Sequence, residues 1–154
     1  MATPKLKTVV IMRLDAACPS HSRTDVSVRD TGLTIDEPVE RGGTNQGPSP
    51  TETLMSALAA CTNVIAHKCA DKHGVSFQDF HVNVVSRFDR RGVTLQEEID
   101  LPFDDIEVRI DVTTDADDCA IERVKADLPR FCPVSKVMRQ AGSSVTDVWT
   151  IKRP

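Results

Sequence analysis

The chain has 154 residues, of which 40% are hydrophobic and 27% charged, a composition typical of one globular domain. Its formal net charge of −4 offers no basic surface for nucleic acid, and no apolar run approaches the roughly 18 residues that a membrane span needs. The five cysteines are odd in number and include no Cys-x-x-Cys pair, which argues against a disulfide framework and a zinc site.

The first third of the chain is predicted to form short strands. Residues 7–14 are rich in β-branched and apolar side chains, and residues 24–29 alternate around Val26 and Val28. Residues 33–36 are short and lie between a glycine and a proline. Together these segments predict an antiparallel meander. Residues 40–50 hold three glycines and two prolines, which indicates a loop.

A long helix is predicted to follow this loop. Ser49 suits the N-cap, Pro50 the first helical position, and Glu52 completes a Ser-x-x-Glu capping box. Apolar side chains then recur every three or four residues in one stripe about four turns long. The stripe consists of Leu54, Leu58, Cys61, Ile65 and Cys69, and Gly74 marks the end of the helix. Because the helix is rich in alanine, we expect it to be central and covered on most sides.

The remaining elements alternate between strands and helices. Residues 81–88 and 106–112 predict strands, and the charged segment 90–105 between them predicts an irregular connection. Residues 117–128 predict a helix that ends at Pro129, and Cys132-Pro133 begins a short helix that stops at Gly142. A closing strand is expected over residues 145–151. The order β-β-β-α-β-β-α-α-β predicts a single α+β domain, residues 1–154, with helices packed on antiparallel sheets.

Two cysteines lie on predicted helices and have competing interpretations. Cys132 lies at a helix N-terminus, where unpaired N–H groups and the helix dipole stabilise a thiolate, and Arg130 is close in sequence. It can equally be a small buried apolar residue. Cys61 lies mid-helix on the apolar stripe, where desolvation raises a thiol pKa, so position alone favours a core role. We interpret Cys18, Cys69 and Cys119 as structural or incidental.

Other polar residues give weaker signals. The capping box already accounts for Glu52. The histidines show no ligand spacing with one another or with a carboxylate cluster, so we expect no metal. The N-terminus lacks the apolar segment of a signal peptide, and we therefore expect a cytoplasmic protein. In the cytoplasm, paired cysteines are more often catalytic than structural.

The two cysteine motifs together resemble those of the OsmC/Ohr family, the osmotically inducible protein C and organic hydroperoxide resistance proteins. The first motif runs from Gly42 to Thr62 as Gly-Gly-x-x-x-Gly-Pro-Ser-Pro-Thr-Glu-x-Leu-x-x-Ala-Leu-Ala-Ala-Cys-Thr, and the second is Phe-Cys-Pro-Val-Ser-Lys over residues 131–136. The resemblance extends from about Asp36 to the end of the chain. It implies an α+β, OsmC-like fold with antiparallel sheets around a long central helix, assembled as an intertwined homodimer.

The resemblance also implies a mechanism. Cys61 would be the peroxidatic thiolate, which reduces an organic hydroperoxide and becomes a sulfenic acid. Cys132 would resolve that acid as a disulfide, and an external dithiol would reduce the disulfide without metal, flavin or another cofactor. This assignment conflicts with the positional argument, which favours Cys132 as the more acidic thiol. The family interpretation requires a cation near Cys61.

In the family, an arginine held by a glutamate supplies that cation. Arg41 lies 20 residues before Cys61, a spacing like that of OsmC proteins, whereas Arg23 is the nearest candidate for the position used in the hydroperoxide resistance branch. Glu52 is the expected glutamate. The acid directly follows the proline in both of those branches, but here Thr51 intervenes, as in a less characterised Pro-x-Glu branch.

Helix geometry predicts a dimer. Nine residues separate Glu52 from Cys61, so the two are roughly 13 Å apart along a helix and half a turn out of phase. They cannot touch within one chain, and a second subunit must supply one of them if both serve the same site. The small side chains of the helix also suit close packing against a copy of itself.

Three functional hypotheses remain open at this point. The leading one is a cytoplasmic thiol peroxidase that acts on alkyl or lipid hydroperoxides, because an apolar surface near Cys61 favours burial of alkyl groups. The second is a non-catalytic redox sensor or ligand-binding dimer on the same scaffold. The third is a structural dimer whose cysteines belong only to the core.

Overall fold

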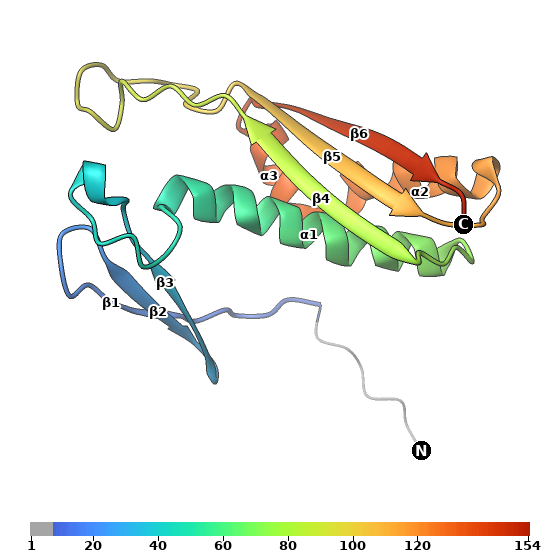
Figure 1. Cartoon of the computed structure of the whole chain (residues 1–154), viewed down its shortest axis with the longest axis horizontal. Coiled ribbons are helices and arrows are strands. Elements are labelled where there is room, and N and C mark those ends of the chain that lie inside the picture. Colours follow the sequence, from blue (N-terminus) through green and yellow to red (C-terminus); the bar gives the residue numbers. More distant parts are fainter. Residues whose placement is uncertain (1–7) are drawn as a thin grey trace. The chain divides into compact units, whose positions relative to one another are not determined.

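The computed structural model describes residues 8–154 (Figure 1). The chain divides into two compact units, the first ending at Thr53 and the second spanning Leu54–Pro154. Its elements are β1 (Asp15–Ala17), β2 (Thr24–Val28), β3 (Thr31–Ile35), a 3-10 turn (Val39–Arg41), α1 (Pro50–Lys72), β4 (Asp79–Ser86), β5 (Asp105–Thr113), α2 (Asp118–Phe131), α3 (Pro133–Gln140) and β6 (Ser144–Lys152). Within the described residues, none of the helices combines the length and apolarity needed to traverse a bilayer.

The first unit contains the expected meander, an antiparallel sheet in the order β1-β2-β3. The strand expected over residues 7–14 is wrong for the described part: residues 8–14 form no strand, and residue 7 lies outside the described residues. The reason is the register. Asp15 pairs with Ser27, and β2 ends one residue later at Val28, so the residues before Leu14 extend past the end of β2. Their apolar side chains, such as Met12, are exposed.

The second unit is built on a sheet in the order β4-β5-β6. Strands β4 and β5 are antiparallel, with Ser86 opposite Ile106, whereas β5 and β6 are parallel, with Ile106 opposite Val145. A parallel pair requires a crossover connection. Here α2 and α3 form it, and all three helices lie on one face of the sheet (Figure 1). The predicted α+β fold with antiparallel sheets is confirmed, and β5–β6 is its one parallel pairing among the described strands.

The core of the second unit lies between the sheet and its helices. The alternation predicted for β5 holds, and its inward side chains, Ile106, Val108, Ile110 and Val112, are almost fully buried. On α1 the buried face is rotated from the predicted stripe and consists of Leu58, Thr62, Ala66, Cys69 and Ala70. Leu54 and Val64 are exposed, so α1 is not covered on most sides within one chain.

The end of α2 differs from the sequence prediction. Pro129 lies inside the helix, which continues to Phe131, because the N–H of Cys132 donates to the carbonyl of Leu128 at 2.9 Å and closes the last turn. Cys132 therefore serves both as the C-cap of α2 and as the N-cap of α3. Pro133 occupies the first position of α3, as expected.

A buried carboxylate joins the C-terminal end of α1 to α2. Asp127 Oδ2 lies 2.6 Å from Lys72 Nζ and 2.9 Å from His73 Nε2, and Asp127 Oδ1 lies 3.0 Å from Arg130 Nη1. The hydrogen bonds from Lys72 and His73 are the main causes that lower the pKa of Asp127 to about 2. The carboxylate thus stays ionised in the folded protein to much lower pH than in an unfolded chain.

This lowered pKa predicts a pH-dependent contribution to stability. A depressed carboxylate pKa stabilises the fold above the unfolded pKa, about 4, and the stabilisation is lost as the pH falls toward 2. Asp127→Asn should therefore lower the free energy of unfolding at pH 7, and its difference from the wild type should shrink between pH 4 and 2. Urea unfolding measures this, with Asp71→Asn on the exposed side of α1 as the control. A difference that is independent of pH would contradict the prediction.

Candidate functional site

The structure brings the two motif cysteines together. Cys132 Sγ lies 3.2 Å from Cys61 Sγ and donates a hydrogen bond to it, although 71 residues separate the two in the chain. Cys61 lies in the middle of α1 and is partly exposed, whereas Cys132 at the α2–α3 junction is only 1% exposed. A disulfide has an S–S distance of about 2.05 Å, so bond formation requires an approach of only about 1 Å.

The acidity of Cys132 differs from the positional prediction. Burial is the largest effect and raises the pKa of the Cys132 thiol to about 11, and the nearby sulfur of Cys61 raises it further. The backbone N–H groups of Ser135 and Val134 at the start of α3 oppose this shift, as a helix N-terminus should, but they do not outweigh desolvation. The expectation that the helix N-terminus makes the Cys132 thiol acidic is therefore wrong, because the pKa of this thiol is raised and not lowered.

The other cysteines have no comparable arrangement. Cys69 is buried, and burial raises the pKa of its thiol. Cys18 is exposed, as is Cys119, whose sulfur accepts a hydrogen bond from Arg123 Nη1 at 3.1 Å. Among residues 8–154 no cluster of histidine, cysteine and carboxylate side chains is able to hold a metal ion.

Glu52 forms the capping box that the sequence predicts. Its carboxylate Oε2 accepts hydrogen bonds from the backbone N–H of Ser49 at 2.7 Å and from the Ser49 hydroxyl at 2.8 Å. These two bonds are the main causes that lower the pKa of Glu52, and the positive charge of Arg41 lowers it further. Glu52 is thus an anion within the electrostatic reach of Arg41.

The two candidate arginines have different partners. Arg41 Nε lies 2.8 Å from Glu37 Oε2, an ion pair that lacks the alignment of a hydrogen bond. Arg23 instead contacts Asp25 at 3.0 Å through Nε and donates to Gln46 Oε1 at 2.7 Å through Nη1. Arg41 is therefore the arginine whose charge acts on Glu52, and Glu37 is a partner that sequence reasoning did not identify.

Sequence reasoning also missed Asp36, the first residue of the loop that carries Arg41 and the acceptor of several of its hydrogen bonds. Asp36 is fully buried, and its Oδ1 accepts from the N–H of Glu37 at 2.9 Å. Its Oδ2 accepts from the N–H and the hydroxyl of Thr44, at 2.9 and 2.6 Å, and from the N–H of Gln46 at 3.2 Å. The Thr44 hydroxyl is the main cause that lowers the pKa of Asp36 to about 2. The sequence does place an aspartate at the end of a strand and before a glycine-rich loop. Aspartate at such a position often accepts hydrogen bonds from backbone N–H groups of the following turn.

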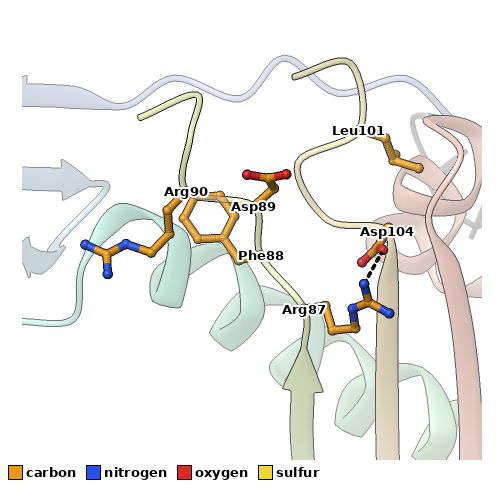
Figure 2. A pocket seen from close by; sticks show the side chains of 6 residues that line it. All are labelled: Arg87, Phe88, Asp89, Arg90, Leu101 and Asp104. Carbon is orange, nitrogen blue, oxygen red and sulfur yellow. Dashed lines mark ion pairs between the residues drawn. The ribbon is translucent and has the colours of Figure 1, made fainter. Parts of the chain in front are cut away.

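The irregular segment between β4 and β5 forms a polar hollow of about 460 Å³. Figure 2 shows its lining residues, Arg87, Phe88, Asp89, Arg90, Leu101 and Asp104. Arg87 and Asp104 face each other and form an ion pair of 3.1 Å, whereas the side chain of Arg90 extends away from them. Among the described residues, no cysteine belongs to the lining of this hollow.

A smaller hollow of about 200 Å³ has the character expected for an apolar ligand. Its walls come from the start of α1, from α3 and from the segment before β5, and they include Met55, Leu101, Phe103, Val137 and Met138. Met55, Phe103 and Met138 pack in the same hydrophobic cluster as Cys61 and Cys132. Met55 lies six residues before Cys61 on α1, and Met138 lies six residues after Cys132, the N-cap of α3. Six residues of helix span about 9 Å along the axis.

Comparison with known families identifies one match. The family model described as OsmC-like protein matches residues 43–146, which is more than half of the chain and includes both motif cysteines. No curated protein matches the chain.

Solved structures show the same fold. An OsmC-like protein from Mycoplasma pneumoniae aligns with a TM-score of 0.77 and 16% identity over 92% of this chain and 97% of its own. An organic hydroperoxide resistance protein from Legionella pneumophila aligns with a TM-score of 0.62 and 16% identity over 95% and 99%. The organic hydroperoxide resistance protein OhrB of Bacillus subtilis aligns with a TM-score of 0.57 and 22% identity over 93% and 98%. At these identities the likeness concerns the fold.

Proposed function

This chain belongs to the family of OsmC-like proteins, as its motifs suggested, and on that basis we propose that it is a thiol-dependent peroxidase for organic hydroperoxides. The observation that carries the proposal is the 3.2 Å distance between the sulfur atoms of Cys61 and Cys132. A thiol pair at this distance suits a cycle of oxidation and disulfide formation.

In the proposed cycle, the thiolate of Cys61 attacks the distal oxygen of the hydroperoxide. The O–O bond breaks, the alkoxide takes up a proton and leaves as the alcohol, and Cys61 becomes a sulfenic acid. The sulfur of Cys132 then attacks the sulfur of Cys61, releasing water and forming the disulfide. An external dithiol supplies the two electrons and two protons that restore both thiols.

The contrast between the two thiols supports this division of roles. Cys61 is partly exposed and within reach of a small substrate, whereas the 1% exposure of Cys132 leaves little room for one. With its pKa raised to about 11, Cys132 keeps its proton and donates a hydrogen bond to the sulfur of Cys61. This direction of the hydrogen bond, with Cys61 as the acceptor, supports Cys61 as the attacking group and Cys132 as the resolving one.

The apolar hollow supports an organic peroxide as the substrate. Its lining is mostly methionine, phenylalanine and aliphatic side chains, which favour an alkyl or aryl group over water. Hydrogen peroxide has no such group and gains nothing from this surface. The peroxidase would act in the cytoplasm, where thiols are kept reduced.

We also propose that Arg41 and Glu52 complete the site and that the protein works as a homodimer. Glu52 and Cys61 are separated by nine residues of the continuous helix α1, about 13 Å along its axis, so they cannot meet within one chain. A partner subunit would bring Arg41 and Glu52 to Cys61. The exposed apolar side chains of Val9, Ile11, Met12, Leu54 and Val64 support a partner that covers them.

A redox sensor is the second candidate, and the burial of Cys132 favours it. Only the Cys61 sulfur of the disulfide would be open to attack by a dithiol, and with one of the two sulfurs closed to attack a bulky dithiol should reduce the disulfide more slowly. Slow reduction would let the oxidised form persist. A sensor of this kind would consume one equivalent of peroxide and then stop.

Peroxide consumption separates these functions. With cumene hydroperoxide and excess dithiothreitol, we expect the protein to reduce many equivalents of peroxide per chain. Mass spectrometry without the dithiol should show a peptide that links Cys61 to Cys132, and Cys18 and Cys119 should remain unlinked. Consumption that stops after one equivalent would favour the sensor, and the absence of the linked peptide would refute both functions.

A further inference from the structure

The loop over residues 36–47, here called the Arg41 loop, is organised around one buried carboxylate. The four hydrogen bonds that Asp36 accepts come from Glu37, Thr44 and Gln46, so they tie the two ends of the loop together. The backbone N–H of Asp36 itself donates to the carbonyl of Pro48 at 3.1 Å. The loop is therefore closed, because its first residue is bonded to residues 44, 46 and 48 near its end.

The backbone of the loop packs directly against Glu37. The N–H of Asn45 donates to the Glu37 carbonyl at 3.1 Å, and a Cβ atom added to Gly43 would lie 1.8 Å from that carbonyl oxygen. Only glycine fits at residue 43, because any side chain would collide with the backbone. The position of Glu37 relative to the loop is therefore determined by backbone contacts on both sides.

Glu37 in turn holds the guanidinium group of Arg41. The ion pair spans one turn, from residue 37 to residue 41, and the Glu37 oxygen that faces Arg41 is buried. Arg41 follows Pro38 in a 3-10 turn, in which the N–H of Arg41 donates to the carbonyl of Pro38 at 2.9 Å. Backbone and side chain of Arg41 are thus both restrained within the Arg41 loop.

We propose that Asp36 and Glu37 are positioning residues for Arg41: Asp36 fixes the course of the loop, and Glu37 fixes the direction of the guanidinium group. The inference rests on the proposed function of Arg41 as the cation of the thiol site. In this arrangement the Glu52 carboxylate accepts hydrogen bonds from Ser49, and Glu37 contacts the Arg41 guanidinium group at 2.8 Å. The two glutamates have separate roles.

Glu37→Gln tests this inference, because a positioning role and a role through charge predict opposite changes in the rate of Cys61 oxidation. The substituted side chain would have the shape of glutamate without its charge, so a role through charge alone predicts a more positive site and faster oxidation of Cys61 by cumene hydroperoxide. A positioning role predicts the opposite, a single-turnover oxidation rate slower by about 10-fold, because misplacing a catalytic group by about 1 Å is costly. Glu37→Asp retains the charge and should recover part of the rate. Glu40→Gln removes the same charge from the same turn and should leave the rate unchanged.

A second measurement is independent of the peroxidase reaction. The side-chain Nε–H signal of Arg41 in a ¹⁵N NMR spectrum should be distinct in the wild type and should move to the position of free arginine in Glu37→Gln and Asp36→Asn. An unchanged Arg41 signal in Glu37→Gln, or faster oxidation of that variant, would overturn the inference. If Arg41→Met oxidises at the wild-type rate, the role of Arg41 in the proposed function fails, and the NMR signal alone then decides whether Asp36 and Glu37 position it.

Discussion

Replacing Cys61 with serine is expected to lower the rate of peroxide turnover by on the order of 10³-fold or more, because it removes the atom that attacks the O–O bond. A hydroxyl group at this position has no thiolate form and does not cycle through a sulfenic acid. Turnover is measured as loss of cumene hydroperoxide with dithiothreitol as the electron donor. The serine should still accept the hydrogen bond from Cys132 Sγ, so the fold should be retained.

The remaining cysteines provide matched controls for this substitution. Cys69→Ser changes a buried thiol on the same helix, and Cys119→Ser changes an exposed thiol beside an arginine. Both variants should keep turnover close to that of the wild type. Without a dithiol, Cys132→Ser should reduce one equivalent of peroxide and accumulate a sulfenic acid on Cys61, which dimedone labels. Full turnover by Cys61→Ser would refute the peroxidase mechanism proposed above.

Mixing two inactive variants is expected to restore activity if the sites are shared between subunits. In a mixture of Cys61→Ser and Arg41→Met chains, about half of the dimers after random exchange contain one chain of each kind. One of the two sites in such a dimer would combine an intact Cys61 with an intact Arg41 from the other chain. The mixture should therefore reach about a quarter of the wild-type activity, although each variant alone has almost none.

The exchange must be complete for this result to be interpretable. Unfolding and refolding the mixed chains together achieves it, and each variant refolded alone is the control. A mixture without activity would show that Arg41 and Cys61 act within one chain or not in one site. A mass of one chain, 16.9 kDa, in light scattering would exclude the dimer directly.

Local patterns in the sequence were sufficient to predict most elements. The capping residues around Ser49, the even spacing in β5 and the proline after Cys132 each report on a few neighbouring residues. The features that the sequence did not reveal depend on distant segments. The parallel pairing of β5 with β6 needs the crossover through α2 and α3, and the absence of a strand over residues 8–14 depends on where β2 ends.

In the candidate site, too, local motifs were predictable from the sequence, whereas features that depend on distant segments were not. The motifs identified Cys61 and Cys132, and the structure places their sulfurs in contact. Position in the helix predicted an acidic Cys132, but the burial that raises its pKa arises only when α1, α3 and the sheet pack around it. Asp36 and Glu37 were missed because their partners lie up to ten residues away in an irregular loop.

Joining the two sulfurs would turn part of the chain into a covalent ring. The ring would close 71 residues after Cys61 and would enclose β4, β5 and α2. A cross-link over this length removes entropy from the unfolded chain, worth about 4 kcal/mol on a loop-closure estimate. The oxidised protein should therefore melt at a higher temperature than the reduced one. Reduction of the disulfide would restore the thiols for the next peroxide and would at the same time lower the stability of the fold.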